Sequence, residues 1–237
     1  MIGPDITYRS TEAEIMDDFY IEGDELHGAL DQIAGINKML GGNAITLDGV
    51  KQLLKNHDKS VAVTIADVGC GNGDMLRMLA DYGMREGYTF NLIGVDANPN
   101  TVAYAKQLSA TYQIKYLCLD VFKTDFENLK YDIALCTLTL HHFSNEMIAK
   151  LLSTFETNAS IGIVINDLHR SKVAYGLFRV ISPVLGLNKM ARQDGLVSIL
   201  RGFRKIEIEK MAENLGLKKH SIRWRWAFRY QWIIEKT

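Results

Sequence analysis

Two hydrophobic patterns divide the chain. In the first part, apolar residues recur every three or four positions at 26–40 and 47–54, as on one face of a helix. From about residue 61, short apolar runs of strand length alternate with helical patterns. The expected strands are 61–68, 90–95, 114–119, 131–136 and 161–165. Strands that alternate with helices predict an α/β fold whose parallel sheet is covered on both faces.

The pattern changes in two later regions. Residues 168–203 separate the fifth strand from the next helix, and a connection of this length is usually functional, for example as a lid. Residues 218–235, after a helix at about 205–215, predict two antiparallel strands. We therefore expect an N-terminal helical cap at 1–58 and a larger domain at 59–237, with a lid insertion at about 168–203.

Composition narrows the class of protein. The 237 residues carry a net charge of -1, so the global basicity of many nucleic-acid binders is excluded. No apolar run reaches the roughly 18–20 residues that cross a bilayer, and the first twenty residues lack a signal pattern. The three cysteines, Cys70, Cys118 and Cys136, are far apart in apolar segments, which favours buried thiols in a reducing, cytoplasmic setting.

Polar residues follow three successive strands. The segment 67–74, DVGCGNGD, lies between a strand and a helix, where glycines allow a sharp turn and close approach to a ligand. Asp96 ends the second strand and can accept hydrogen bonds from both hydroxyls of a ribose, although an acid at a helix N-terminus is the alternative. Asp120 ends the third strand beside apolar Val121, which suits an adenine. Ligands of such sheets bind at the carboxyl ends of the strands.

These motifs, with GVDANP, CLDVF and YDIALCTLTLHHF, make residues 60–237 resemble the class I S-adenosylmethionine-dependent methyltransferases. The resemblance implies a Rossmann-like seven-stranded sheet, mostly parallel with an antiparallel last strand, and S-adenosylmethionine as the cofactor. Asp67 would position the methionine amino group, Asp96 the ribose, and Asp120 with Val121 the adenine. The full set of implied cofactor residues is Asp67, Gly69, Cys70, Gly71, Gly73, Asp96, Ala97, Asp120, Val121 and Thr137.

A nicotinamide-dependent oxidoreductase is the main competitor, because it too has an acid after the second strand. Its usual turn is G-x-G-x-x-G, whereas Asp74 stands here where the third glycine would fall. An RNA or protein methyltransferase and a cofactor-binding protein without catalysis are further alternatives. The fourth strand lacks the proline motif of methyltransferases that modify nucleic-acid amino groups, which argues against that chemistry.

Three histidines are candidates for a general base. His141 and His142 follow the fourth strand, and His169 follows the fifth. A histidine can take the proton of a hydroxyl acceptor near neutral pH. The alternative for His141 and His142 is that one is packed and hydrogen-bonded while the other shapes the pocket, and for His169 it is a helix-capping cluster at 166–170. Cys136 is better explained as a buried thiol than as a nucleophile.

The acceptor is expected to be a small molecule that carries a phenolic, quinol-like or lipid-like hydroxyl. Phe19 and Tyr20 would form part of an apolar wall, and Arg170 and Arg201 would bind an anionic group of the substrate. No metal is expected, nucleic acid is an unlikely partner, and the sequence does not determine the oligomeric state. Segments 14–17, 37–42, 166–170 and 201–204 also resemble a bacterial methyltransferase group associated with polyketide and aryl-lipid gene clusters.

Overall fold

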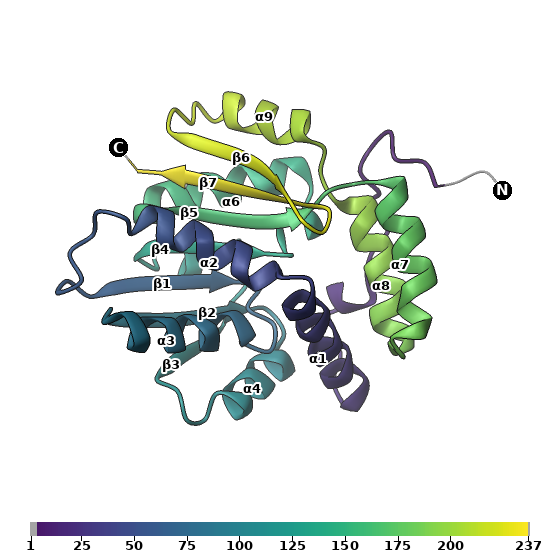
Figure 1. Ribbon diagram of the computed structural model, residues 1–237, viewed down its shortest axis with the longest axis horizontal. Helices are drawn as coiled ribbons and strands as arrows, with labels where there is room; N and C mark the ends of the chain where they lie inside the picture. Colours follow the sequence, from purple (N-terminus) through teal and green to yellow (C-terminus); the bar gives the residue numbers. More distant parts are fainter. Residues whose placement is uncertain (1–3, 237) are drawn as a thin grey trace.

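The computed structural model describes residues 4–236, so residues 1–3 and 237 of the expected cap and domain lie outside the described residues. Its centre is one seven-stranded sheet with the order β3-β2-β1-β4-β5-β7-β6 (Figure 1). The strands are β1 (Val63–Val68), β2 (Phe90–Asp96), β3 (Ile114–Cys118), β4 (Tyr131–Thr137), β5 (Ala159–Leu168), β6 (His220–Arg225) and β7 (Arg229–Glu235). β7 pairs antiparallel with both β5 and β6, and all the other pairs are parallel, which confirms the expected Rossmann-like sheet.

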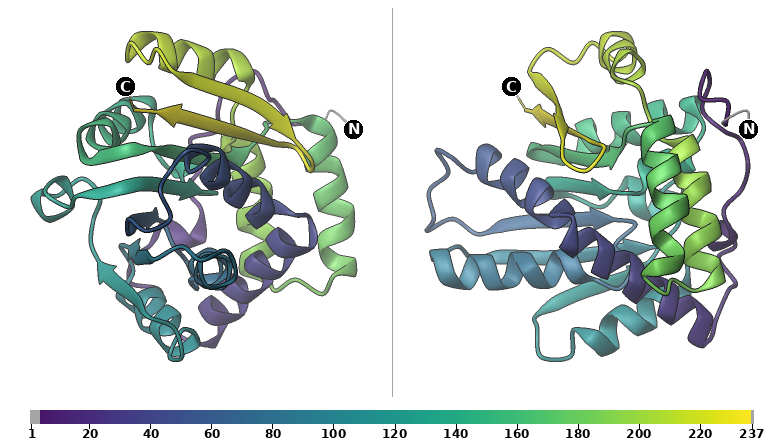
Figure 2. Two further views of the ribbon diagram at one scale, coloured as in Figure 1. Left: turned by 60° about the vertical axis from the view of Figure 1, so that its left-hand side comes forward. Right: turned by 45° about the vertical axis from the view of Figure 1, so that its right-hand side comes forward.

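Helices cover both faces of the sheet (Figures 1 and 2). The helices are η1 (Ile15–Asp17), α1 (Asp24–Met39), α2 (Gly42–Leu53), α3 (Asp74–Glu86), α4 (Pro99–Leu108), α5 (Thr124–Glu127), η2 (Leu140–His142), α6 (Asn145–Asn158), α7 (Lys172–Val184), α8 (Lys189–Arg201) and α9 (Lys205–Asn214). Along β1, Ile65 belongs to the buried cluster under α2, α3 and α4, whereas Ala66 belongs to the cluster under α6 and α9. Alternate side chains of a strand point to opposite faces, so both faces are buried.

Local sequence signals explain where several helices begin. The Asn98 side chain accepts hydrogen bonds from the backbone amides of Asn100 and Thr101, and Pro99 occupies the first turn of α4. The Ser144 hydroxyl accepts a hydrogen bond from the amide of Met147 at the start of α6. Asn and Ser are common at this position, because their side-chain oxygens accept hydrogen bonds from amides that have no partner within the helix.

A further layer lies across the carboxyl ends of the parallel strands (Figure 1, right). The expected insertion at 168–203 contains an antiparallel pair of helices, α7 and α8, and α8 packs against α1 and η1. Ala29 of α1 and Met190 and Ala191 of α8 form a small buried cluster between them. The cap and lid boundaries stay a prediction. Within residues 4–236, no helix is both long and apolar enough to cross a membrane.

Arginines hold the N-terminal segment in this layer. The Arg9 guanidinium donates hydrogen bonds to the backbone carbonyls of Arg201, His141 and Phe143 over 2.8–3.0 Å. Arg170 Nε donates to the carbonyl of Ile6 at 3.0 Å. The segment that leads to η1 is therefore attached to the loop after β4 and to the end of α8.

Candidate active site at the carboxyl ends of the strands

The turn after β1 has a backbone that only glycine accommodates well. Gly69 and Gly73 have φ angles of +70° and +80°, in the left-handed region. A Cβ at Gly69 would lie 2.2 Å from the Thr139 hydroxyl, and one at Gly73 would lie 2.1 Å from the Tyr116 hydroxyl. The glycines therefore serve both the turn and the close packing around it, and α3 begins directly afterwards at Asp74.

A cavity of about 480 Å³ lies between this turn, the ends of β2, β3 and β4, and the covering elements η1 and α1. Nine of the ten residues expected to bind the cofactor line it: Asp67, Gly69, Cys70, Gly71, Asp96, Ala97, Asp120, Val121 and Thr137. Gly73 does not line it and acts within the turn. The roles of the individual residues toward a ligand stay predictions.

The carboxylates of the cavity differ in their hydrogen bonds. The two oxygens of Asp96 accept hydrogen bonds from the amides of Asn98 and Gly71 at 3.0 and 3.3 Å. Burial raises the pKa of Asp96, although these two hydrogen bonds act in the opposite direction. Asp67 is buried, and its Oδ1 has no hydrogen-bond partner within residues 4–236. Burial, followed by the charges of Asp74 and Asp96, raises the pKa of Asp67 well above its usual range.

The carboxylates that line the cavity are not balanced by basic lysine or arginine side chains in the described lining. Five aspartates line it, Asp17, Asp67, Asp74, Asp96 and Asp120, and none of its described lining residues is Lys or Arg. The covering side is apolar, with Phe19 of the N-terminal segment and with Leu26, Leu30 and Ile33 of α1. Such a cavity suits a ligand that carries positive charge and hydroxyl groups, and it disfavours a pyrophosphate.

His142 is the one of the three candidate histidines that lines the cavity. Its Nδ1 lies 2.5 Å from Asp17 Oδ1, and its Nε2 lies 3.8 Å from Glu14 Oε2. Asp17 also accepts a hydrogen bond from Arg201 Nη1 at 2.6 Å. Burial raises the pKa of Asp17, but the hydrogen bonds from His142 and Arg201 outweigh burial and hold that pKa below its usual range. A fixed acceptor at Nδ1 orients the imidazole.

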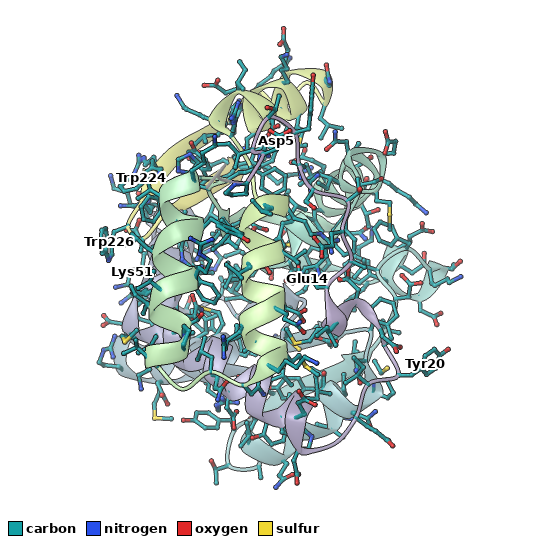
Figure 3. The ribbon with its side chains drawn as sticks, turned by 90° about the vertical axis from the view of Figure 1, so that its right-hand side faces the viewer. Asp5, Glu14, Tyr20, Lys51, Trp224 and Trp226 are labelled. Carbon is teal, nitrogen blue, oxygen red and sulfur yellow. The ribbon has the colours of Figure 1, made fainter. Side chains whose placement is uncertain are left out.

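His141 lies beneath this pair and is buried away from the cavity. Its Nδ1 is 2.7 Å from Asp167 Oδ1, and its Nε2 faces Glu14 Oε1 at 3.5 Å. Burial raises the pKa of Glu14 to about 7, although the charges of His142 and Arg201 and the hydrogen bond from Ser198 act against it. Figure 3 shows Glu14 beside α8. The geometry gives His141 a structural position rather than access to a substrate.

Glu14, His141 and His142 also form a group whose ligand atoms lie within 4.8 Å of one another, close enough to hold a metal ion. The sequence analysis did not expect this group, because Glu14 is far from the histidines along the chain. Arg201 Nη1 lies 3.7 Å from Glu14 Oε1 and already provides a positive charge there. We therefore interpret the group as an ionic network.

Four other predicted residues lie outside the cavity, and their expected roles are corrected. Arg170 is 1% exposed, and its guanidinium pairs with Glu207 at 2.6 Å, so it is not available to a substrate. Arg201 is buried against Asp17. The His169 ring accepts a hydrogen bond from Trp224 Nε1 at 3.3 Å, away from the cavity. Tyr20 is 88% exposed and points outward in Figure 3.

Other residues of the cavity were missed. Asn37 and Asn43 line it together with Asp74, whose Oδ2 accepts a hydrogen bond from the Asn43 side chain at 2.6 Å. Asp17 and Asn37 lie in segments 14–17 and 37–42, which resemble a bacterial methyltransferase group, but no role was predicted for either residue. Asp74 stands inside the glycine-rich motif.

Comparisons with known proteins agree with this arrangement. Residues 65–158 match a methyltransferase domain family. The plantazolicin methyltransferase BpumL, solved with S-adenosylhomocysteine, is 16% identical with a TM-score of 0.67, over 88% of this chain and 89% of that one. Magnesium protoporphyrin IX methyltransferase from Synechocystis PCC 6803, solved with S-adenosylmethionine, is 15% identical with a TM-score of 0.56, over 94% and 89%.

Human N-acetylserotonin methyltransferase, solved with S-adenosylmethionine, is 15% identical with a TM-score of 0.58, over 90% of this chain and 56% of that one. No curated protein sequence matches this chain. These comparisons confirm two predictions, the methyltransferase domain and S-adenosylmethionine as the cofactor. Residues 65–158 are therefore a methyltransferase domain, and the chain has the fold of the class I S-adenosylmethionine-dependent methyltransferases.

Proposed function

We propose that this protein transfers the methyl group of S-adenosylmethionine to a hydroxyl of a small, uncharged and largely apolar acceptor. One observation carries the proposal: a single cavity joins five aspartates and a glycine turn to an apolar wall and one histidine–carboxylate pair. S-adenosylmethionine supplies a positively charged sulfonium whose methyl group is electrophilic. The aspartates favour that charge and disfavour the anionic pyrophosphate of NAD.

The residues of the strand ends are suited to hold the cofactor. Among the described residues, none is a hydrogen-bond partner of the buried Oδ1 of Asp67, which is a suitable acceptor for the amino group of the methionine part. Asp96 retains acceptor capacity beyond its two backbone amides, because an ionised carboxylate offers about four lone-pair sites. Asp120 and Val121 would contact the adenine, as the resemblance implies.

The apolar wall would align the acceptor and exclude water. Phe19, Leu30 and Phe143 line the cavity together with His142. Alignment of two reactants makes a bimolecular step effectively unimolecular, and effective molarities of about 10⁵–10⁸ M are known for well-oriented groups. Because the described lining contains no cation to pair with an acidic substrate, a neutral hydroxyl fits better than a carboxylate.

His142 would take the proton of that hydroxyl. Asp17 accepts a hydrogen bond from Nδ1, so the neutral ring keeps its lone pair on Nε2. As the acceptor oxygen forms its bond to the methyl carbon, the carbon–sulfur bond breaks and the O–H proton moves to Nε2. Arg201 donates a hydrogen bond to Asp17 and positions it, so Arg201 is a positioning residue that does not contact the substrate.

The acceptor does not follow from the fold. The similar structures are named as methyltransferases of plantazolicin, magnesium protoporphyrin IX and N-acetylserotonin, which are chemically different molecules. The choice of a hydroxyl rests on the histidine and the lining of this cavity. A cytoplasmic location stays a prediction.

Two measurements test the proposal. Calorimetric titration should show binding of S-adenosylhomocysteine and none of NAD, whereas preference for NAD would refute it. Incubation with labelled S-adenosylmethionine and a panel of phenols, quinols and neutral lipids should then yield a methyl ether. Exclusive labelling of amines, carboxylates or nucleic acid would refute the acceptor class while leaving the methyltransferase reaction in place.

A further inference from the structure

The outer face of α7 is apolar and uncovered. Five residues of α7 form this face, and each is between 44% and 82% exposed: Val173, Leu177, Val180, Ile181 and Val184. Their spacing of one, three or four positions places them on one stripe of the helix. Scattered exposed apolar residues are ordinary, but a continuous stripe marks an interaction site.

Folding does not require this stripe. Another side of α7 serves the core: Ala174 and Ser182 are buried, and Phe178 packs against the cluster that contains Met190 and Ala191 of α8. A Cβ at Gly195 would lie 2.4 Å from the Phe178 ring, so α7 and α8 are in close contact there. The helix is therefore apolar on two sides, and only one of them serves the core.

Two tryptophans extend the stripe. Trp224 and Trp226, near the turn between β6 and β7, are 49% and 67% exposed and lie beside α7 in Figure 3. Trp224 donates a hydrogen bond to His169, which lies three residues before α7, so this tryptophan is held near the start of the helix. Tryptophan is enriched where a protein meets the interface of a lipid bilayer.

Basic residues outnumber acidic ones around this surface, where Asp5 lies near Lys172 and Asp48 pairs with Arg225. Residues 172–193 contain Lys172, Arg179, Lys189 and Arg192, all exposed, and no Asp or Glu. Residues 220–234 likewise contain no acid, and Arg223 is exposed beside the tryptophans. Because the whole chain has a net charge of -1, this positive charge is a local feature.

We infer that the α7 stripe, with Trp224 and Trp226, binds the surface of a lipid bilayer that contains anionic lipids. An apolar helix face flanked by basic residues inserts into the headgroup region, and the basic residues add attraction to negative lipid. A second copy of this chain fits less well, since two faces of the same positive sign would repel each other. The inference goes beyond the proposed reaction and does not depend on it.

Vesicle flotation tests the inference with the full chain. The protein should float with vesicles of phosphatidylcholine mixed with phosphatidylglycerol, much less with phosphatidylcholine alone, and less at about 0.5 M salt, where charges are screened. The double variant Val180→Asp/Val184→Asp should lose at least about tenfold in binding, because two charged groups replace inserted apolar ones. Arg179→Gln should lose about fivefold on the anionic vesicles only.

Met84→Asp is the matched control, since Met84 is 82% exposed on α3, far from α7 along the chain. Cofactor affinity and melting temperature of all variants should stay those of the parent chain. Equal flotation of the parent and the double variant would overturn the inference. So would a dimer, measured by light scattering, that Val180→Asp/Val184→Asp dissociates while neither protein binds vesicles.

Discussion

The two sides of the cavity are built in different ways. On the strand side, Asp67, Asp96 and Asp120 stand where consecutive parallel strands end, and the chain topology alone brings them together. On the covering side, Asp17 meets His142 across 125 positions of sequence, and the contact depends on arginines that attach the N-terminal segment. In the proposed reaction, the strand side binds the methyl donor, and the covering side binds the acceptor and takes its proton.

The largest expected effect separates the two sides. His142→Ala should lower kcat by about 10²–10⁴-fold, the usual contribution of a general base, while the affinity for S-adenosylhomocysteine stays unchanged. His169→Ala, outside the cavity, is the control and should retain activity. Retained activity in His142→Ala together with its loss in His169→Ala would reverse the assignment.

The buried Glu14 makes stability depend on pH. Its folded-state pKa is about 7 against an ordinary 4.5, so between these values the folded protein keeps a proton that the unfolded chain has lost. The free energy of unfolding should therefore fall as the pH rises from 4.5 to 7, by on the order of 3 kcal/mol, and stay level above that.

Glu14→Gln should remove this decline, because the amide does not titrate. Urea unfolding at several pH values between 4.5 and 8 measures it, with Asp125→Asn, at an exposed position of α5, as the control. A parallel pH dependence in the parent chain and Glu14→Gln would contradict the assignment of the decline to Glu14.

A variant on the strand side should change cofactor affinity rather than kcat, the reverse of the expectation for His142→Ala. Asp96→Asn should weaken cofactor binding by about 10–100-fold, as expected when hydrogen bonds to a charged group are lost. Once the cofactor is saturating, kcat should change much less. Calorimetry and saturation kinetics separate the two effects, and an unchanged cofactor affinity would remove Asp96 from the binding site.

The smallest effect tests a residue that the sequence singled out. Tyr20→Ala should leave cofactor affinity and kcat within about twofold, as is usual for exposed positions without partners. Phe19→Ala is the informative neighbour, because Phe19 lines the cavity. A rise in KM for the acceptor in Phe19→Ala, with none in Tyr20→Ala, would sharpen the boundary of the apolar wall.

These contrasts explain how far the sequence could be interpreted. The order of strands and helices and the caps at Asn98 and Ser144 were predictable from local chemistry and from the rules of parallel sheets. The nine lining residues on the strand side followed from the resemblance to the class I methyltransferases. The role of Arg170 could not be predicted, because the local sequence does not reveal that Arg170 donates hydrogen bonds to Glu207 and to the Ile6 carbonyl. The role of Asp17 was missed for the same reason: although segment 14–17 was noted, the contacts of Asp17 with His142 and Arg201 are tertiary.

The attachment of the N-terminal segment has a practical consequence. Arg9 joins that segment to the carbonyls of His141 and Phe143, and Ser10 N donates to the Leu200 carbonyl at 3.0 Å. A protease cut or a bulky fusion just ahead of Ser10 would leave every cavity-lining residue in the chain and yet loosen the hold on Asp17. Under the proposed function, protein damaged in this way would bind S-adenosylmethionine normally and turn over slowly, so assays need a preparation in which Arg9 is present and its contacts are intact.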